Sequence, residues 1–107
     1  MSGISTHILD TAHGRPATGV PVSLEIASDG GWRSLGHGAT DADGRLRTLL
    51  TTRPEAGMYR LTFDTSAYFP DGFFPKVTIT FRVDAGQEHY HVPLLLSPFG
   101  YSTYRGS

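Results

Sequence analysis

Hydrophobic and polar residues alternate along several short stretches of the chain. In residues 20–27, 58–63 and 76–83, every second residue is aliphatic or aromatic. Successive side chains of a strand point to opposite faces, so each stretch predicts a strand with one buried face. Residues 31–38 are plausible as a further short strand. Glycine, proline, aspartate, serine and threonine recur between these stretches. The pattern therefore predicts an all-β fold, a two-sheet sandwich or a barrel.

Two further predicted strands, residues 4–10 and 89–97, have unusual outer faces. One face of each strand carries mainly aliphatic side chains and suits the core. The opposite faces mix histidine with large apolar residues; they carry Ser5, His7, Leu9, His89, His91, Pro93, Leu95 and Ser97. A solvent-exposed face rarely holds so much apolar surface. We expect another copy of the same chain to cover it.

Turn residues separate the predicted strands. The segment DADGR, residues 41–45, predicts a tight turn in which Gly44 supplies a positive φ, and Asp41 and Asp43 are most simply turn residues. Residues 65–75 contain two prolines and have room for at most one short helix before Pro70 or Pro75.

Length and composition narrow the class of protein. The 107 residues predict one domain, residues 1–107. A net charge of −1 without a basic block argues against a nucleic-acid partner. The absence of cysteine excludes disulfides, thiolate metal sites and cysteine nucleophiles, and it favours the cytoplasm. We find no signal-peptide pattern at the start and no apolar run of the roughly 20 residues that span a membrane.

Candidate chemistry comes from histidine and arginine. His7 and His91 lie on the outer faces of their strands, so their rings meet if those strands are neighbours. Arg45 follows the tight turn and could reach the same region. Histidine takes up and returns protons near neutral pH, and arginine offers donors to carbonyl or oxyanion oxygens. Such a group suits a polar heterocycle better than an apolar ligand.

The other histidines have simpler interpretations. His13 and His37 sit in or next to turns, and His89 lies at the start of its strand, where we expect it to be exposed to solvent. The pair His89 and His91 could bind a metal as H-x-H. No carboxylate or third histidine stands close by in the sequence, so a metal site is disfavoured. Ser107 alone would be a frayed terminus. From patterning alone, the chain is a sandwich with a histidine-bearing interface.

Three segments resemble the transthyretin-related family. They are STHILDTAHGRPATGVPVSL near the start, DADGR in the middle and HYHVPLLLSPFGYSTYRGS at the end, so the resemblance covers Ile4 to Ser107. The family divides into transthyretins, which carry thyroid hormones, and 5-hydroxyisourate hydrolases of urate degradation. The hydrolase branch is marked by four features, present here as His7, Arg45, His91 and the terminal Tyr104-Arg105-Gly106-Ser107.

The resemblance implies a sandwich of about eight antiparallel strands with one short helix. It also implies a homotetramer, a dimer of dimers with an open channel, whose purine-derived substrate 5-hydroxyisourate is hydrolysed at its N1–C6 amide bond. No metal or organic cofactor is implied. The implied catalytic residues are His7, Arg45, His91 and Ser107. The implied substrate contacts are His7, Arg45, Tyr104, Arg105 and Gly106. Which histidine is the general base stays open, and a carrier without catalysis is the alternative, with a structural or interaction module as a further rival.

Overall fold

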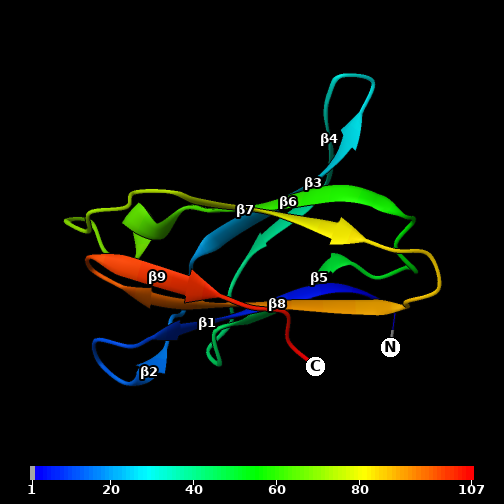
Figure 1. Ribbon diagram of the computed structural model, residues 1–107. Helices are drawn as coiled ribbons and strands as arrows, with labels where there is room; N and C mark the ends of the chain where they lie inside the picture. Colours follow the sequence, from blue (N-terminus) through cyan, green and yellow to red (C-terminus); the bar gives the residue numbers. More distant parts are fainter. Residues whose placement is uncertain (1) are drawn as a thin grey trace.

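The computed structural model describes residues 2–107 as two β-sheets packed face to face (Figure 1). One sheet has the strand order β2-β1-β8-β9, with β5 also paired to β1, and the other has the order β4-β3-β6-β7. The strands are β1 (Gly3–Asp10), β2 (Arg15–Pro16), β3 (Pro21–Ser28), β4 (Gly31–Ala39), β5 (Arg45–Leu50), β6 (Gly57–Phe63), β7 (Val77–Val83), β8 (His89–Ser97) and β9 (Gly100–Thr103). A 3₁₀ turn, η1 (Thr65–Ala67), precedes Pro70, which matches the predicted single short helix.

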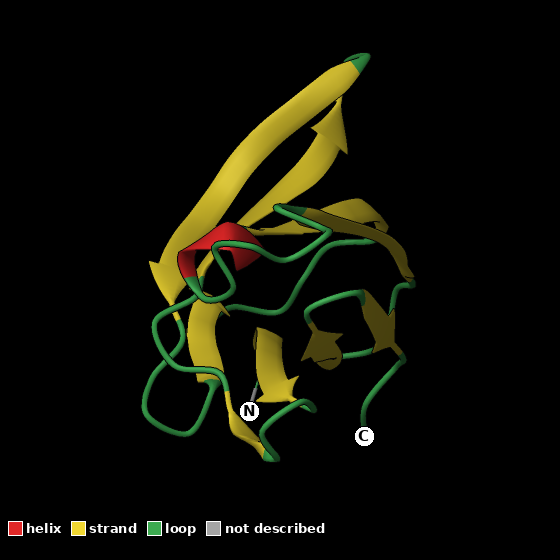
Figure 2. Cartoon of the chain, turned by 90° about the vertical axis from the view of Figure 1, so that its left-hand side faces the viewer, coloured by secondary structure: helices red, strands yellow, loops and turns green. Residues whose placement is uncertain are grey.

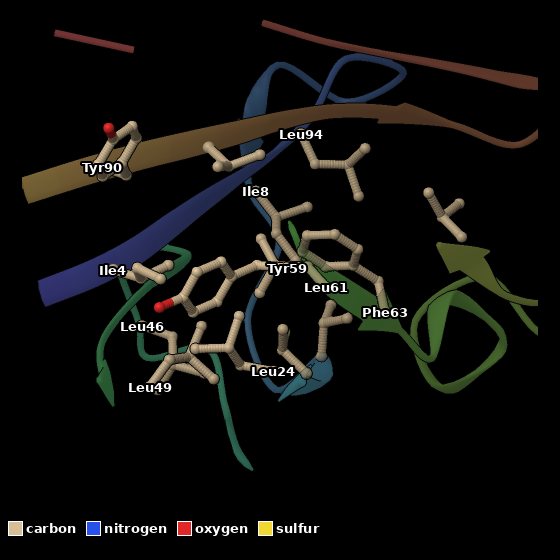
Figure 3. Close-up of a cluster of buried hydrophobic side chains, with 14 of the residues drawn as sticks. Ile4, Ile8, Leu24, Leu46, Leu49, Tyr59, Leu61, Phe63, Tyr90 and Leu94 are labelled. Carbon is tan, nitrogen blue, oxygen red and sulfur yellow. The ribbon is translucent and has the colours of Figure 1, made fainter. Parts of the chain in front are cut away.

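The alternating stretches place their apolar residues between the sheets. Tyr59, Leu61 and Phe63 of β6 are fully buried, and Ile4 and Ile8 of β1 face them from the other sheet (Figure 3). Burying an aliphatic or aromatic side chain of this size stabilises the fold by about 1.5–3 kcal/mol. The predicted inner faces of β1, β3, β6 and β8 are therefore confirmed.

A parallel pairing inside the first sheet positions the residues of interest. β1 lies between β8, which runs parallel to it, and β5, which runs antiparallel. In this register Ser5 is opposite His91 and His7 is opposite both Pro93 and Arg45. Since directly opposite residues share a face, the outer face of this sheet gathers polar side chains from three strands. The strands at 4–10 and 89–97 are therefore neighbours, which is the condition on which the sequence interpretation of His7 and His91 depended.

The hairpin of β3 and β4 projects from one end of the sandwich (Figure 2). Most of β4 is exposed or only partly buried, because its far end lies beyond the opposing sheet. The segment predicted as a short strand at 31–38 is therefore a strand, and it is nine residues long. It belongs to the other sheet, not to the sheet that carries the polar face of β1, β5 and β8.

The last strand ends before the final four residues. β9 stops at Thr103, and only an isolated bridge between His91 and Gly106 continues the pairing with β8. Tyr104 and Arg105 therefore do not follow the two-residue period of a strand. This difference decides where their side chains point.

Candidate active site

A tight turn places Arg45 opposite His7. The Asp41 carboxylate accepts hydrogen bonds from the backbone N–H groups of Asp43 (2.9 Å) and Arg45 (3.0 Å), which closes the turn. Gly44 has a φ of 73°, and a Cβ there would lie 2.4 Å from the Ile8 carbonyl oxygen. Only glycine suits both the positive φ and this close approach. The predicted role of Gly44 is confirmed, and the turn delivers β5 to the edge of β1.

The outer faces of β1, β5 and β8 enclose a hollow of about 170 Å³, here called the outer-face pocket. Its lining residues are Ser5, Thr6, Arg45, Arg47, His89, His91 and Ser107. His7 is not among them, but it stands directly opposite Arg45 on the same face. The structure thus brings His7, Arg45, His91 and Ser107 to one region of the sheet, from four separate parts of the sequence.

The Ser5 hydroxyl holds two imidazole rings together. Its Oγ lies 2.8 Å from His91 Nδ1 and 3.1 Å from His89 Nε2, and the residue is only 5% exposed. Within residues 2–107, the one buried side-chain nitrogen or oxygen without a hydrogen-bond partner is His89 Nδ1. His89 was predicted to be solvent-exposed, and this is wrong. The β1–β8 pairing sets it opposite Gly3, and the Ser5 hydroxyl binds its ring.

The surroundings of His91 oppose a positive charge on its ring. Burial lowers the pKa of His91 below 6.5, and the positive charge of Arg45 lowers it further, with smaller contributions from His7, His89 and Arg47. The ring is therefore neutral near pH 7. Among residues 2–107, no carboxylate lies within ion-pair distance of the Arg45 guanidinium. Its charge is free to interact with a ligand.

The end of the chain packs directly on His91. The Gly106 N–H donates a hydrogen bond of 2.8 Å to the His91 carbonyl, and a Cβ on Gly106 would lie 2.6 Å from His91 Cδ2. The absence of a side chain lets the backbone approach the imidazole closely. This contact carries Ser107 into the outer-face pocket. Gly106 and Ser107 therefore lie beside His91 on the side of the outer-face pocket.

The side chains of Tyr104 and Arg105 lie outside the outer-face pocket. They line a different hollow of about 240 Å³ between β7 and β8, here called the edge pocket. The other residues of the edge pocket are Ile79, Thr80, Phe81, Arg82, Tyr90, His91, Val92 and Thr103. The Arg105 guanidinium lies 4.9 Å from the centre of the Tyr90 ring and donates to Gln87 Oε1 at 3.1 Å. Within one chain, the grouping of Tyr104 and Arg105 with His7 and Arg45 is not found.

The edge pocket is larger, and most of its wall is apolar, although Arg82, His91 and Arg105 also line it. The smaller outer-face pocket has a more polar wall and holds two histidines, two arginines and two serines. Acid–base and electrostatic catalysis need titratable groups and donors that converge. We therefore take the outer-face pocket, with His7 beside it, as the candidate active site.

Besides Thr6, three lining residues escaped the sequence interpretation as site residues. Ser5 and Arg47 share the outer face with His7 and Arg45, because each lies two residues away on the same strand. His89 has the same relation to His91. The two-residue period, applied to β5 as it was to β1 and β8, is the signal that finds all three.

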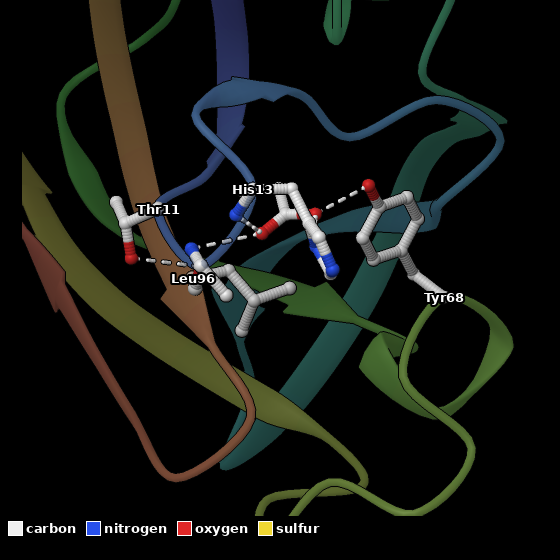
Figure 4. Close-up of polar contacts among 6 residues, drawn as sticks. Thr11, His13, Tyr68 and Leu96 are labelled. Carbon is white, nitrogen blue, oxygen red and sulfur yellow. Dashed lines mark hydrogen bonds and ion pairs between the residues drawn. The ribbon is translucent and has the colours of Figure 1, made fainter.

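A second polar cluster, centred on Asp10 and containing His13, lies at the far end of β1 (Figure 4). The buried Asp10 carboxylate accepts hydrogen bonds from the Tyr68 hydroxyl (2.7 Å), from His13 Nδ1 (2.8 Å) and from the backbone N–H groups of Ala12 and His13 (3.0 Å each). Burial alone would raise the pKa of Asp10, but these hydrogen bonds outweigh it, and the pKa is lowered below 3.8. We call this group the Asp10 cluster.

No group of three histidine, aspartate or glutamate side chains among residues 2–107 is placed to hold a metal ion. No helix in the same residues is long and apolar enough to cross a membrane.

Comparison with known proteins places the chain in a family. Residues 4–106 match the HIUase/Transthyretin family. A relative from Salmonella dublin named 5-hydroxyisourate hydrolase is 50% identical over 97% of this chain and 80% of the relative. The solved structure of Klebsiella pneumoniae 5-hydroxyisourate hydrolase matches all of both chains, with a TM-score of 0.86 and 41% identity.

A transthyretin has an equally similar fold. Sea bream transthyretin, solved in complex with thyroxine, matches 96% of this chain and 93% of its own, with a TM-score of 0.89 and 36% identity. The chain is a transthyretin-like β-sandwich and belongs to the HIUase/Transthyretin family. Because the fold is common to both branches, the side chains of the outer-face pocket carry the functional argument.

Proposed function

We propose that this protein hydrolyses 5-hydroxyisourate at its N1–C6 amide bond, giving 2-oxo-4-hydroxy-4-carboxy-5-ureidoimidazoline in urate degradation. The observation that carries the proposal is the convergence of His91, Arg45 and Ser107 on one open pocket, with His7 directly opposite Arg45. The relatives named 5-hydroxyisourate hydrolase, at identities up to 50%, support the same activity.

The reaction needs a group that accepts a proton from water. As the water oxygen bonds to the amide carbonyl carbon, one O–H bond must break. A neutral imidazole of His7 or His91 can take that proton. The tetrahedral intermediate then collapses, its C–N bond breaks, and the protonated imidazole returns the proton to the leaving nitrogen. The ring opens with no net change in the protonation of the enzyme.

Arg45 is suited to the charge that grows on the carbonyl oxygen. Its guanidinium is positively charged at all relevant pH values and has no carboxylate partner within residues 2–107. A donor that is already in place where negative charge develops lowers the barrier without reorganisation. Arg45 could equally hold a neighbouring carbonyl and orient the ring.

The tail supplies the remaining groups of the proposed site. Ser107 reaches the outer-face pocket and is placed to orient the water or relay a proton. Gly106 fixes the tail on His91. Tyr104 and Arg105 face the edge pocket, so their proposed contact with substrate would need a second copy of the chain.

The proposed assembly is a homotetramer of single transthyretin-like domains, residues 1–107. The outer face of β1 and β8 supports it, because Leu9 and Leu95 lie among the polar residues of that face and stay partly exposed. Obligate interfaces commonly bury roughly 2,000 Å² or more in total. Light scattering at micromolar concentration should give the mass of four chains, and a monomer would contradict the assembly.

The alternative is a carrier that binds a small molecule without changing it. The close structural match to a transthyretin in complex with thyroxine favours this reading of the fold. The pocket argues against it, since an apolar hormone would not need two histidines and two arginines in one small hollow. Small or apolar groups would serve such a ligand better.

One experiment separates the hydrolase from the carrier. 5-Hydroxyisourate is generated from urate, and the decay of its near-ultraviolet absorbance is followed with and without the protein. Catalysed decay, proportional to protein concentration, is expected. Decay no faster than in buffer, with saturable retention of the compound by the protein, would identify a carrier.

A further inference from the structure

The Ser5 hydroxyl restricts which ring nitrogens of two neighbouring histidines can carry a proton. It lies within hydrogen-bond distance of two ring nitrogens, His91 Nδ1 and His89 Nε2. A serine hydroxyl donates one hydrogen bond and accepts up to two. If it donates to one ring, the other ring must donate to it. The tautomers of His89 and His91 are therefore linked through Ser5.

A third possibility, in which both rings donate to Ser5, would leave the buried Ser5 O–H without an acceptor, because within residues 2–107 its oxygen lies within hydrogen-bond distance of these two rings only. Two arrangements remain in which the Ser5 hydroxyl donates its proton and both rings are neutral. In the first, His89 carries its proton on Nε2 and donates to Ser5, which donates to His91 Nδ1. His91 then carries its own proton on Nε2. In the second, Ser5 donates to His89 Nε2, and His91 donates from Nδ1. His91 Nε2 then holds a free electron pair, and the proton of His89 sits on its Nδ1.

The unpartnered His89 Nδ1 discriminates between the two arrangements. This atom is buried and has no hydrogen-bond partner within residues 2–107. A buried N–H without an acceptor is rarer and more costly than a buried acceptor that lacks one donor. The first arrangement leaves a lone pair on His89 Nδ1, whereas the second leaves an N–H there. The first arrangement is therefore the more stable.

We propose that Ser5 is a positioning residue that keeps the proton of His91 on Nε2, so that His91 is a neutral hydrogen-bond donor and His7 is the general base. The proposal rests on the proposed function for its chemical meaning. His7 alone then takes the proton from water and returns it to the leaving nitrogen. His91 Nε2 donates to a carbonyl oxygen of the substrate and stays neutral throughout.

The charges around His91 are consistent with this role. After burial, the largest contributions to the pKa of His91 come from Arg45 and Arg47 of β5, His7 of β1 and His89 of β8, and none of these side chains is an anion. Together with burial they lower the pKa of His91, which keeps the ring uncharged near neutral pH. A neutral imidazole can polarise a carbonyl as a donor, and this role needs its proton on the nitrogen that faces the substrate.

The direct test is ¹⁵N NMR of the histidine rings in the free protein at pH 8, which assigns the tautomer of each neutral ring. We expect His91 to be protonated on Nε2 and unprotonated on Nδ1. In Ser5→Ala, the two tautomers of His91 should mix. In the control Thr11→Ala, which removes another hydroxyl that links β1 to β8, they should not. A wild-type His91 protonated on Nδ1, or an unchanged tautomer in Ser5→Ala, would overturn the proposal.

Kinetics give a second readout. Ser5→Ala should lower kcat by roughly 10-fold with KM within about twofold, less than the roughly 10² to 10⁴ of a lost acid–base group. Ser5→Thr keeps a hydroxyl and should restore most of the rate. If Ser5→Ala does not fold, His89→Leu replaces it, since loss of the donor to Ser5 should also mix the tautomers. A wild-type protein that shows the expected tautomer but does not hydrolyse 5-hydroxyisourate would refute the proposed function and leave the tautomer assignment standing.

Discussion

A polar cluster that contains histidine lies at each end of β1, and the two clusters differ in how their charges are satisfied. At one end, the Asp10 carboxylate receives four hydrogen bonds, and His13 and Tyr68 both point to it. At the other end, Ser5 joins two histidines beside two arginines, without an aspartate or glutamate among the lining residues. Both clusters link β1 to distant parts of the chain. They differ in what remains unsatisfied.

In the Asp10 cluster, the charge and the hydrogen-bonding capacity are used within the fold. The buried carboxylate has its donors, which lowers the pKa of Asp10 despite burial. In the outer-face pocket, no carboxylate of residues 2–107 forms an ion pair with Arg45, and the pKa of His91 is lowered by burial and by cations. A satisfied polar cluster stabilises a structure. A cluster with unmatched positive charge and an open side is suited to a ligand that brings carbonyl or oxyanion oxygens.

Removal of Tyr104 to Ser107 should have the largest effect on hydrolysis. The deletion takes Ser107 out of the outer-face pocket and uncovers His91, so hydrolysis should fall by at least roughly 10³-fold. The core of β3, β6 and β8 is untouched, and the circular dichroism spectrum should stay that of a β-sandwich. Near-full activity in a truncated protein would show that the tail is only a strand end.

Asp10→Asn should act on stability and leave the chemistry alone. The amide has fewer acceptor sites for the four donors around it, so the free energy of unfolding in urea should fall by about 1–3 kcal/mol. Because the pKa of Asp10 is depressed in the folded state, its contribution is present above pH 3.8 and is lost as the pH falls below that value. The difference between the two proteins should therefore shrink in acid. An unchanged urea midpoint at pH 7 would contradict this account.

Gly106→Ala tests whether the contact of the tail with His91 positions the imidazole ring. The new Cβ would lie 2.6 Å from His91 Cδ2, so either the ring or the tail must shift. We expect a loss of roughly 10-fold in kcat/KM, since small displacements of catalytic groups are costly. Gly19→Ala serves as a control for stability, because a Cβ there meets nothing within 4 Å although its positive φ of 78° is strained. Equal kinetics for Gly106→Ala and the wild type would argue that the contact does not position His91.

As the pH falls, protonation of His91 should reduce activity and stability before protonation of Asp10 reduces stability. The folded state favours neutral His91, because its pKa lies below 6.5. Stability linked to this ring is complete above pH 6.5 and declines as the pH falls toward the lowered value. Activity should fall over the same range as histidine becomes protonated. In an NMR titration, Arg45→Gln should raise the pKa of His91; a rate that stays flat from pH 8 to pH 5 would remove neutral histidine from the mechanism.

Much of the fold follows from the two-residue alternation of the sequence. Tyr59, Leu61 and Phe63 are fully buried as the pattern indicates, because a strand between two sheets exposes one face to the core and one to the outside. The same rule puts His7 and His91 on the outer face. It does not show that β1 runs parallel to β8 with Ser5 opposite His91, since register depends on contacts far apart in the sequence.

The structure differs from the sequence interpretation at residues where the hydrogen bonding of a strand begins or ends. His89 stands at the first residue of β8 and was expected to be exposed, but Ser5 of the neighbouring strand binds its ring. Tyr104 and Arg105 follow the last residue of β9, where alternation no longer applies. There the Gly106 contact and the stacking of Arg105 on Tyr90 decide the direction of the chain. Such tertiary contacts leave no periodic trace in a sequence.

The central claim is that His7 of β1 and His91 of β8 are catalytic and that His13 of the Asp10 cluster is not. The most direct test compares kcat/KM for 5-hydroxyisourate among four alanine variants that keep the β-sheet circular dichroism spectrum. His7→Ala and His91→Ala should each lose roughly 10² to 10⁴. His13→Ala and His37→Ala should stay within about twofold of the wild type, because both side chains lie outside the outer-face pocket. Equal losses in all four variants, or an active His7→Ala, would contradict the account.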